Sequence, residues 1–375
     1  MKVVVLKETK DKETRVSVTP GVIKTLIKKE FECSIESGAG LASSYTDEEY
    51  KEAGSEVVNE RDTLLGEADV VLMINPPGVE DVKKMKKGAV LLSFMFAQSN
   101  KELVEACKAQ GISSFSMDFI PRISRAQKMD ALSSQANLAG YKTVMLAANA
   151  SDKIFPLLMT AAGTVKPSSA VIFGAGVAGL QALATANRLG AKVEVSDIRH
   201  ETKEQVESLG GKFIEVEDEG DVATEGGYVK EVSEEFLKKQ KEVVKQRVQN
   251  ADVVITTAQI PGKKAPVLVT EDMMKGMKRG AVIVDMATEQ GGNCEWSEYD
   301  KVVEKEGLKI IGTSNLPGAL PINASELYAK NISEFLMHLA GKDGFHWDME
   351  DQIKIIVPLM ERMKQIKKKH NLKNK

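Results

Sequence analysis

Gly174, Gly176 and Gly179 form a G-x-G-x-x-G pattern within the stretch AVIFGAGVAGLQALATANRLGAKVEVSD. An apolar run precedes the pattern, a segment with helical apolar spacing follows it, and a second apolar run ends at Asp197. In a strand-turn-helix unit of this kind, the first glycine permits the tight turn and the second lets a pyrophosphate approach the backbone. The third lets the helix pack close to the strand. This context predicts a dinucleotide site, whereas the glycine spacing alone would fit a simple turn equally well.

The residue at the end of the second strand selects the dinucleotide. A carboxylate at Asp197 accepts hydrogen bonds from the adenosine ribose and repels the 2′-phosphate of NADP, so we predict NAD(H) as the ligand. Arg199 opposes this choice, because a nearby arginine can accommodate that phosphate. Asp197 ends the strand and therefore carries more weight, which leaves Arg199 on the surface or in the loop. The cofactor-binding residues predicted from this unit are Gly174, Gly176, Val177, Ala178, Gly179, Asp197, Ile198 and Arg199.

Two further loops leave strands that belong to the same predicted sheet. They read TTAQIPG (256–262) and DMATEQGGN (285–293), and open α/β sheets bind ligands at such carboxyl-terminal loops. We predict that Thr257, Ala258, Gln259 and Glu289 contact the cofactor. Asp285, Glu289 and Gln290 have side chains suited to catalysis, but a loop position favours cofactor contact over proton transfer.

The stretch RAQKMDALSSQANLAGY (125–141) is rich in hydrogen-bonding side chains and contains no His or Cys. It precedes a long apolar segment with helical spacing. From the residues alone, it is equally consistent with the first turn of a helix capped by Asp130 or Ser133 and with a ligand-positioning site.

Composition excludes several classes of function. The chain has 375 residues and a formal net charge of −3, which argues against a nucleic-acid partner held by a basic surface. Its three cysteines and four histidines are scattered, so neither a disulfide framework nor a metal site is predicted. The sequence shows neither a signal peptide nor an apolar run long enough to span a membrane, so we expect a cytoplasmic protein without a membrane span of its own.

Short β-branched runs alternate with helical spacing in two series, one in the first third of the chain and one from Ala170 onward. This rhythm predicts an α/β fold of two open, parallel-sheet, Rossmann-like domains separated by a cleft. We place the N-terminal domain at 1–132 with a return at 319–375, and the dinucleotide domain at 133–318. A polar insertion suggests a mobile loop near 218–232, and the basic tail suggests a solvated helix.

Long motifs resemble the NAD(H)-binding component, domain I, of proton-translocating NAD(P) transhydrogenase of the Si/Re-specific type. They include PRISRAQKMDALSSQANLAGYKTVMLAA, MTAAGTVKPSSAVIFGAGVAGLQALATANRLGAKVEVSDIR and VIVDMATEQGGNCEWSE, and the resemblance extends from the N-terminus to about Asn331. It implies a homodimer that binds NADH in the interdomain cleft. It also implies docking to an NADP(H)-binding domain III and a membrane domain II, and hence a peripheral position on the inner (cell) membrane.

The resemblance also implies roles for particular residues. Arg122, Gln127, Asp130 and Ser133 would line the nicotinamide and its ribose, and Gly227 and Tyr228 would lie on a loop that closes over the nucleotide. Direct hydride transfer between two nicotinamides needs rings held roughly 3–3.5 Å apart and no acid or base at the reacting carbon. This requirement accounts for a polar stretch without proton carriers. Because the single fingerprint selects NAD, the NADP site must lie on another polypeptide.

Two alternatives remain open from the sequence. Alanine dehydrogenase retains the counterpart of Arg15 but also uses a Lys and a His, and the corresponding regions here offer Met73, Asn75 and Phe94–Phe96. A non-catalytic NAD-sensing protein would use the nucleotide site alone. The chain stops without the membrane segments that some transhydrogenases carry after this domain, so it resembles either a separately encoded subunit or a shortened form of a longer chain.

Overall fold

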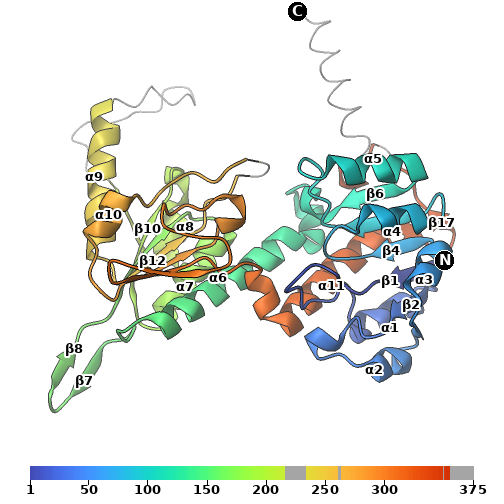
Figure 1. Cartoon of the computed structure of the whole chain (residues 1–375), viewed down its shortest axis with the longest axis horizontal. Coiled ribbons are helices and arrows are strands. Elements are labelled where there is room, and N and C mark those ends of the chain that lie inside the picture. The colour runs from blue at the N-terminus through green and yellow to red at the C-terminus, as the bar shows by residue number, and fades with distance from the viewer. Residues whose placement is uncertain (216–233, 261–262, 349, 355–375) are drawn as a thin grey trace, which may run out of the picture. The chain divides into compact units, whose positions relative to one another are not determined.

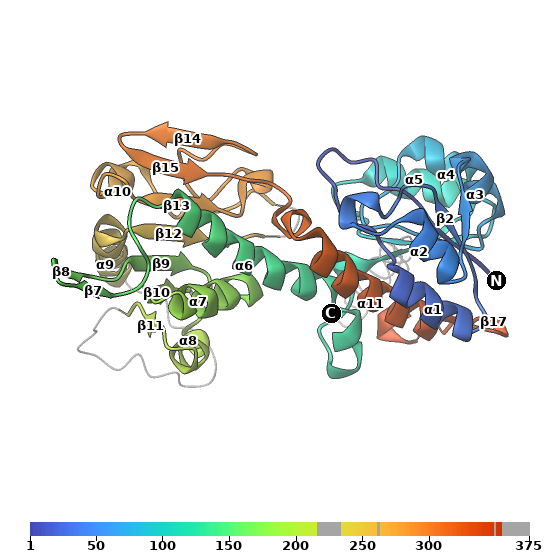
Figure 2. The same ribbon diagram turned by 90° about the horizontal axis from the view of Figure 1, so that it is seen from below.

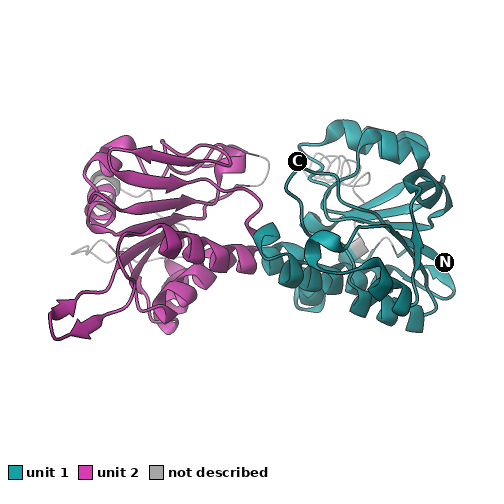
Figure 3. Cartoon of the chain, turned by 60° about the horizontal axis from the view of Figure 1, so that its bottom comes forward, with its two compact units in different colours: residues 1–135, 317–375 teal, residues 136–316 magenta. Residues whose placement is uncertain are grey.

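The computed structural model describes residues 1–215, 234–260, 263–348 and 350–354. The chain divides into two compact units, Met1–Gln135 with Pro317–Lys375 (unit 1) and Ala136–Leu316 (unit 2) (Figure 3). Each unit contains one α/β sheet with helices on both faces, as expected from the alternating pattern of the sequence (Figures 1 and 2).

The sheet of unit 1 has six parallel strands in the order β3-β2-β1-β4-β5-β6. Their bounds are β1 (Lys2–Val5), β2 (Glu32–Glu36), β3 (Glu56–Val58), β4 (Val70–Leu72), β5 (Val90–Ser93) and β6 (Ser113–Ser116). The strand order reverses between β1 and β4. In sheets wound this way, the carboxyl ends of the two strands at the reversal form the usual ligand crevice.

The helices of unit 1 cover the two faces of this sheet. Their bounds are α1 (Pro20–Lys28), α2 (Asp47–Glu52), α3 (Arg61–Glu67), α4 (Val79–Lys84), α5 (Lys101–Gln110) and α11 (Pro321–Leu339), with a small hairpin of β16 (Ala340–Gly341) and β17 (Gly344–Phe345) after α11. Because strand side chains alternate between faces, Val3 and Val5 pack with residues of α1 and α11, whereas Val4 packs with residues of α3, α4 and α5. Burial on both faces accounts for the continuous apolar runs in the sequence.

The sheet of unit 2 has the order β11-β10-β9-β12-β13-β15-β14. Its strands are β9 (Ser169–Phe173), β10 (Lys192–Ser196), β11 (Lys212–Phe213), β12 (Val253–Thr256), β13 (Val282–Asp285), β14 (Val302–Lys305) and β15 (Leu308–Ile311). The prediction of a wholly parallel sheet is wrong for β14, which pairs antiparallel with β15 at the edge seen in Figure 2. The two connecting residues, Glu306 and Gly307, have φ values of 54° and 79°, and this conformation forms a tight hairpin turn.

Helices also cover both faces of the second sheet. They are α6 (Ala131–Ala150, which begins in unit 1), α7 (Val177–Arg188), α8 (Lys203–Ser208), α9 (Glu234–Asn250) and α10 (Glu271–Lys275). Residues of α6, α7 and α8 pack on one face, and residues of α9 and α10 pack on the other. A hairpin of β7 (Leu158–Thr160) and β8 (Gly163–Val165) extends away from the rest of unit 2 (Figure 1). Among the described residues, no helix combines the length and apolar character needed to cross a membrane.

Candidate functional site

In unit 2 the strand order reverses between β9 and β12, and the first glycine of the motif lies at this reversal. Gly174 follows β9 with φ +100°, a conformation that side chains rarely adopt. A Cβ atom at Gly174 would lie 2.5 Å from the Thr257 hydroxyl oxygen, and that hydroxyl donates a hydrogen bond to the Phe173 carbonyl (2.9 Å). Gly174 and Thr257 therefore hold the ends of β9 and β12 together at the point where a dinucleotide fold binds its ligand.

The second and third glycines differ sharply in their surroundings. A Cβ at Gly179 would lie 1.8 Å from the Gly174 carbonyl oxygen, so only glycine permits the close packing of α7 on the turn. At Gly176 a Cβ would meet nothing within 4 Å. Gly176 is the N-cap of α7 and provides no side-chain cap. The first N–H groups of α7, which begins Val177-Ala178, therefore face an open space and suit a negatively charged group.

Asp197 follows β10 and closes the other side of this turn. Its carboxylate accepts hydrogen bonds from the backbone N–H of Ala175 (2.6 Å) and from the backbone and side chain of Arg199. Burial alone would raise the pKa of Asp197, but these hydrogen bonds lower it below its ordinary value. Asp197 is therefore a carboxylate at neutral pH. Between these two residues, the Ile198 side chain is 98% exposed.

The loops after β12 and β13 are tied together by amide groups. Gln259 donates to the Met286 carbonyl (2.7 Å), and the Asn293 side chain both accepts from the Ala258 N–H (3.1 Å) and donates to the Ala258 carbonyl (2.9 Å). Glu289 lies on the short 3-10 helix Thr288–Gln290 and is exposed. These contacts place Thr257, Ala258 and Gln259 in one ordered loop at the end of the sheet that also carries Gly174.

Asp285, one of the acidic residues considered for catalysis, has a structural role. Its side chain is completely buried and accepts hydrogen bonds from the Thr256 and Ser297 hydroxyls and from the N–H groups of Ala287, Asn293 and Cys294. These donors occupy both carboxylate oxygens. Asp285 therefore holds the loop after β13 in shape.

In unit 1 the polar stretch divides into capping residues and exposed residues. Asp130 caps α6, because its carboxylate accepts from the N–H of Ser133 (2.9 Å) and from the Ser133 hydroxyl (2.6 Å). The capping role considered for Asp130 is thus confirmed. Arg122 and Gln127 are exposed, and their side chains make no hydrogen bond or ion pair with other described residues. The 3-10 helix Ser124–Met129 buries Ala126 and Met129, which turns Gln127 outward.

The strand-order reversal in unit 1 is filled by its own side chains. Glu8, after β1, accepts hydrogen bonds from the backbone and the side-chain amide of Asn75, after β4. The Asn75 amide also donates to Glu13 (2.8 Å), and Glu13 forms two hydrogen bonds of 2.7 Å with the Arg15 guanidinium. Arg15 donates in addition to the Gln135 side chain (2.8 Å). Every charged group of this chain of contacts already has a partner.

The two carboxylates of this group differ in their electrostatics. Burial, reinforced by the neighbouring Glu13 charge, raises the pKa of Glu8 to about 7 against the opposing effect of its hydrogen bonds. Burial would also raise the pKa of Glu13, but the hydrogen bonds and charge of Arg15 outweigh it and lower that pKa to about 2. The Arg15 charge is consequently neutralised by Glu13 and is not available to an added carboxylate.

Three predicted features lie outside the described residues: Gly227, Tyr228 and the loop near 218–232, together with the tail after residue 354. One position was missed by the sequence analysis. A Cβ at Gly140 of α6 would lie 2.2 Å from the Ala178 carbonyl oxygen, so this glycine lets α6 approach the start of α7. A glycine within a helical pattern is the signal that could have revealed it.

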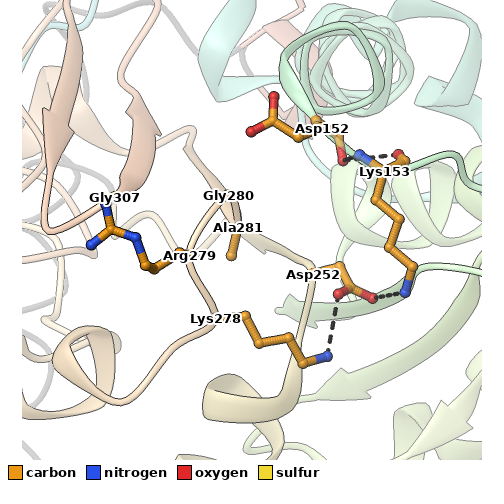
Figure 4. A pocket seen from close by; sticks show the side chains of 9 residues that line it. Asp152, Lys153, Asp252, Lys278, Arg279, Gly280, Ala281 and Gly307 are labelled. Carbon is orange, nitrogen blue, oxygen red and sulfur yellow. Dashed lines mark hydrogen bonds and ion pairs between the residues drawn. The ribbon is translucent and has the colours of Figure 1, made fainter.

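A cavity of about 450 Å³ lies at the opposite, amino-terminal edge of the unit 2 sheet (Figure 4). Its charged side chains pair with one another: Asp252 accepts from Lys153 (2.8 Å) and from Lys278 (3.2 Å), and Asp152 accepts from Lys309 (2.8 Å). This pairing explains the polar lining as a structural ion-pair network. Within the described part of the chain, no group of three ligating side chains is arranged to hold a metal ion.

Comparisons with known proteins agree with this geometry. The model of the alanine dehydrogenase/PNT N-terminal domain matches residues 4–139, and that of the C-terminal domain matches residues 143–360. The first of the separate parts of NAD(P) transhydrogenase subunit alpha in Rhodospirillum rubrum is 49% identical over 92% of this chain and 91% of its own length. The crystal structure of transhydrogenase from Sinorhizobium meliloti superposes with a TM-score of 0.87 at 42% identity, over 95% of this chain and 98% of that one.

Alanine dehydrogenase of Bacillus subtilis is more distant, at 28% identity over 90% of this chain and 85% of its own length. Both family models match, together they cover most of the sequence, and the transhydrogenase subunit exceeds 40% identity. The chain belongs to the alanine dehydrogenase/PNT family.

Proposed function

We propose that this chain is the NAD(H)-binding component of an NAD(P) transhydrogenase. The observation that carries the proposal is the open turn at Gly176, which lies between the crowded glycines at 174 and 179 and has the ionised Asp197 at the end of the next strand. The pyrophosphate would lie at the start of α7, where uncapped N–H groups face open space. The adenosine ribose would bind at Asp197, and the exposed Ile198 provides an apolar surface beside it for the adenine.

The reaction is hydride transfer from NADH to NADP⁺, which yields NAD⁺ and NADPH. The resemblance places Arg122, Gln127, Asp130 and Ser133 at the nicotinamide and its ribose. Arg122 and Gln127 are exposed, and within the described residues their side chains have no partners, so they are available to a ligand. Asp130 and Ser133 are engaged in the cap of α6 and would offer their remaining hydrogen-bonding capacity. Positioning is the only task that direct transfer between nicotinamides requires of these groups.

We further propose that NADP(H) is bound by a partner component, because the fingerprint of this chain selects NAD. The partner would be the NADP(H)-binding and membrane-spanning part of a proton-translocating complex. This chain would act as a homodimer at the cytoplasmic side of the inner membrane and would make no membrane span itself. Its transhydrogenase relatives are named as portions of a subunit alpha, and these names support a role within such an assembly.

Amino-acid oxidation by an alanine dehydrogenase mechanism is less well supported. That reaction needs a cation for the carboxylate of the keto acid and a proton carrier. Arg15 is neutralised by Glu13, and Asn75 is held between Glu8 and Glu13. A protein that only senses NAD would not need the exposed pair Arg122 and Gln127.

The test has two steps on the purified full chain. NADH and NADPH are first titrated by nicotinamide fluorescence, and saturable NADH binding with NADPH at least tenfold weaker is expected. The NADP(H)-binding component of a related transhydrogenase is then added, and hydride transfer from NADH to NADP⁺ is measured. Equal binding of the two nucleotides, or tight NADH binding without any transfer in the presence of the partner, would contradict the proposal. Oxidation of L-alanine by the chain alone would favour the alanine dehydrogenase function.

A further inference from the structure

The carboxylate of Asp197 has no vacant acceptor position in this structure. A carboxylate offers about four lone-pair sites. One oxygen accepts from the Ala175 N–H (2.6 Å) and from an Arg199 guanidinium nitrogen (3.0 Å), and the other accepts from the Arg199 N–H (2.8 Å) and from Arg199 Nε (3.1 Å). The side chain of Arg199 therefore occupies two of the four sites. The Asp197 side chain is only 6% exposed as a result.

The backbone and the side chain of Arg199 are held very differently. The Arg199 carbonyl accepts hydrogen bonds from the N–H (3.1 Å) and the hydroxyl (2.8 Å) of the buried Thr202, which fixes the backbone. The side chain is 50% exposed, and Asp197 is its only hydrogen-bonding partner among the described residues. Rotation of the guanidinium into solvent would therefore break two hydrogen bonds and leave the loop intact.

We propose that Arg199 acts as an internal competitor of the adenosine ribose at Asp197. This inference rests on the proposed function, because it assumes that Asp197 binds the ribose of NADH. The ribose hydroxyls can donate to Asp197 only after the guanidinium has left, whereas the backbone hydrogen bonds from Ala175 and Arg199 remain and keep the carboxylate oriented. The measured dissociation constant for NADH is then the intrinsic constant multiplied by one plus the closed-to-open ratio of Arg199.

The same residue would affect the two nucleotides in opposite directions. A 2′-phosphate is repelled by Asp197 and attracted by a guanidinium turned away from it, since arginine forms paired hydrogen bonds with phosphate oxygens. Arg199 would thus weaken NADH binding and strengthen the residual binding of NADPH. Its removal should increase the discrimination in favour of NADH, although it is the residue that the sequence alone would assign to NADP.

The experiment compares the full chain with R199A and with a control variant, R188A. Arg188 lies at the far end of α7, is exposed, and carries the same charge. NADH, NADPH and ADP-ribose are titrated at one fixed ionic strength, and thermal unfolding verifies that each variant is folded. We expect R199A to bind NADH and ADP-ribose about three- to tenfold more tightly and NADPH more weakly, since a half-exposed forked ion pair is worth a factor of that order. R188A should bind all three ligands as the unmodified chain does.

A double-mutant comparison separates competition at Asp197 from a general charge effect. In a D197N background, R199A should leave NADH binding unchanged, because the group for which Arg199 competes is absent. Unchanged or weaker NADH binding by R199A in the unmodified background would overturn the competitor role and leave the NAD(H) site itself intact. If the unmodified chain, R199A and R188A all fail to bind NADH while remaining folded, the proposed function fails and the competitor role fails with it.

Discussion

Two glycine-to-alanine substitutions in the same turn should have opposite effects, and they provide the sharpest test of the dinucleotide site. In Gly179→Ala, the new Cβ would lie 1.8 Å from the Gly174 carbonyl oxygen. Non-bonded contacts below about 3 Å are not tolerated, so α7 must move by more than 1 Å at its buried start. Overpacking of this kind costs about 2–3 kcal/mol of the free energy of unfolding.

In Gly176→Ala, the Cβ meets nothing within 4 Å, and the backbone, with φ −79°, already suits alanine. The free energy of unfolding should change by less than about 0.5 kcal/mol, or rise slightly because the unfolded chain loses freedom. The methyl group would, however, occupy the space assigned to the pyrophosphate. Loss of one hydrogen bond to a charged group costs about 1.5–3 kcal/mol, which corresponds to roughly a 10- to 100-fold rise in the dissociation constant for NADH.

Urea unfolding and fluorescence titration of NADH, applied to both variants and to the unmodified chain, measure the two effects separately. Gly176→Ala should be stable and bind poorly, while Gly179→Ala should be unstable. A stable Gly176→Ala chain that binds NADH as tightly as the unmodified chain would refute the placement of the pyrophosphate at the start of α7. A Gly179→Ala chain of unchanged stability would refute the close packing of α7 on the turn.

Three further outcomes follow from unit 1. Glu13→Gln leaves the buried Arg15 guanidinium without its carboxylate and should lower the free energy of unfolding by about 3–5 kcal/mol in urea; a loss below 1 kcal/mol would contradict the buried pair. The pKa of Glu13 is lowered from its ordinary 4.5 to about 2. The unfolded chain therefore takes up the proton first as the pH falls, and about 3 kcal/mol of stability should be lost between about pH 4.5 and 2. Unfolding measured across this range should show no such component in Glu13→Gln. Gln127→Ala should leave the thermal unfolding midpoint unchanged and lower hydride transfer at least tenfold in the presence of the partner; normal transfer would remove Gln127 from the nicotinamide site.

Local sequence signals were sufficient where the structure depends on neighbours in the chain. The run from Ser169 to Asp197 encodes strand, glycine turn, helix and second strand through apolar period and glycine spacing, and the structure contains all four as β9, the turn at Gly174, α7 and β10. The alternation of such units predicted two α/β sheets. The antiparallel β14 escaped that rhythm because a two-residue hairpin replaces the crossover helix there.

The partner of each polar side chain depended on the tertiary structure. Asp285 looked suited to chemistry from its loop, yet folding surrounds it with five donors and makes it structural. Arg15 reaches Gln135, which lies 120 residues further along the chain, and its charge is neutralised by Glu13. Arg199 read as a surface residue, but its side chain folds back onto Asp197.

The physical reason lies in the range of the two kinds of information. Helix and strand periods, glycine turns and helix caps are set by residues within a few positions of one another, so the sequence by itself determined the two sheets and the position of the nucleotide turn. Hydrogen-bond saturation and burial depend on which distant segments the fold brings together, and both change the charge that a side chain can offer to a ligand. Only the tertiary structure could therefore show which carboxylates and guanidinium groups are already occupied.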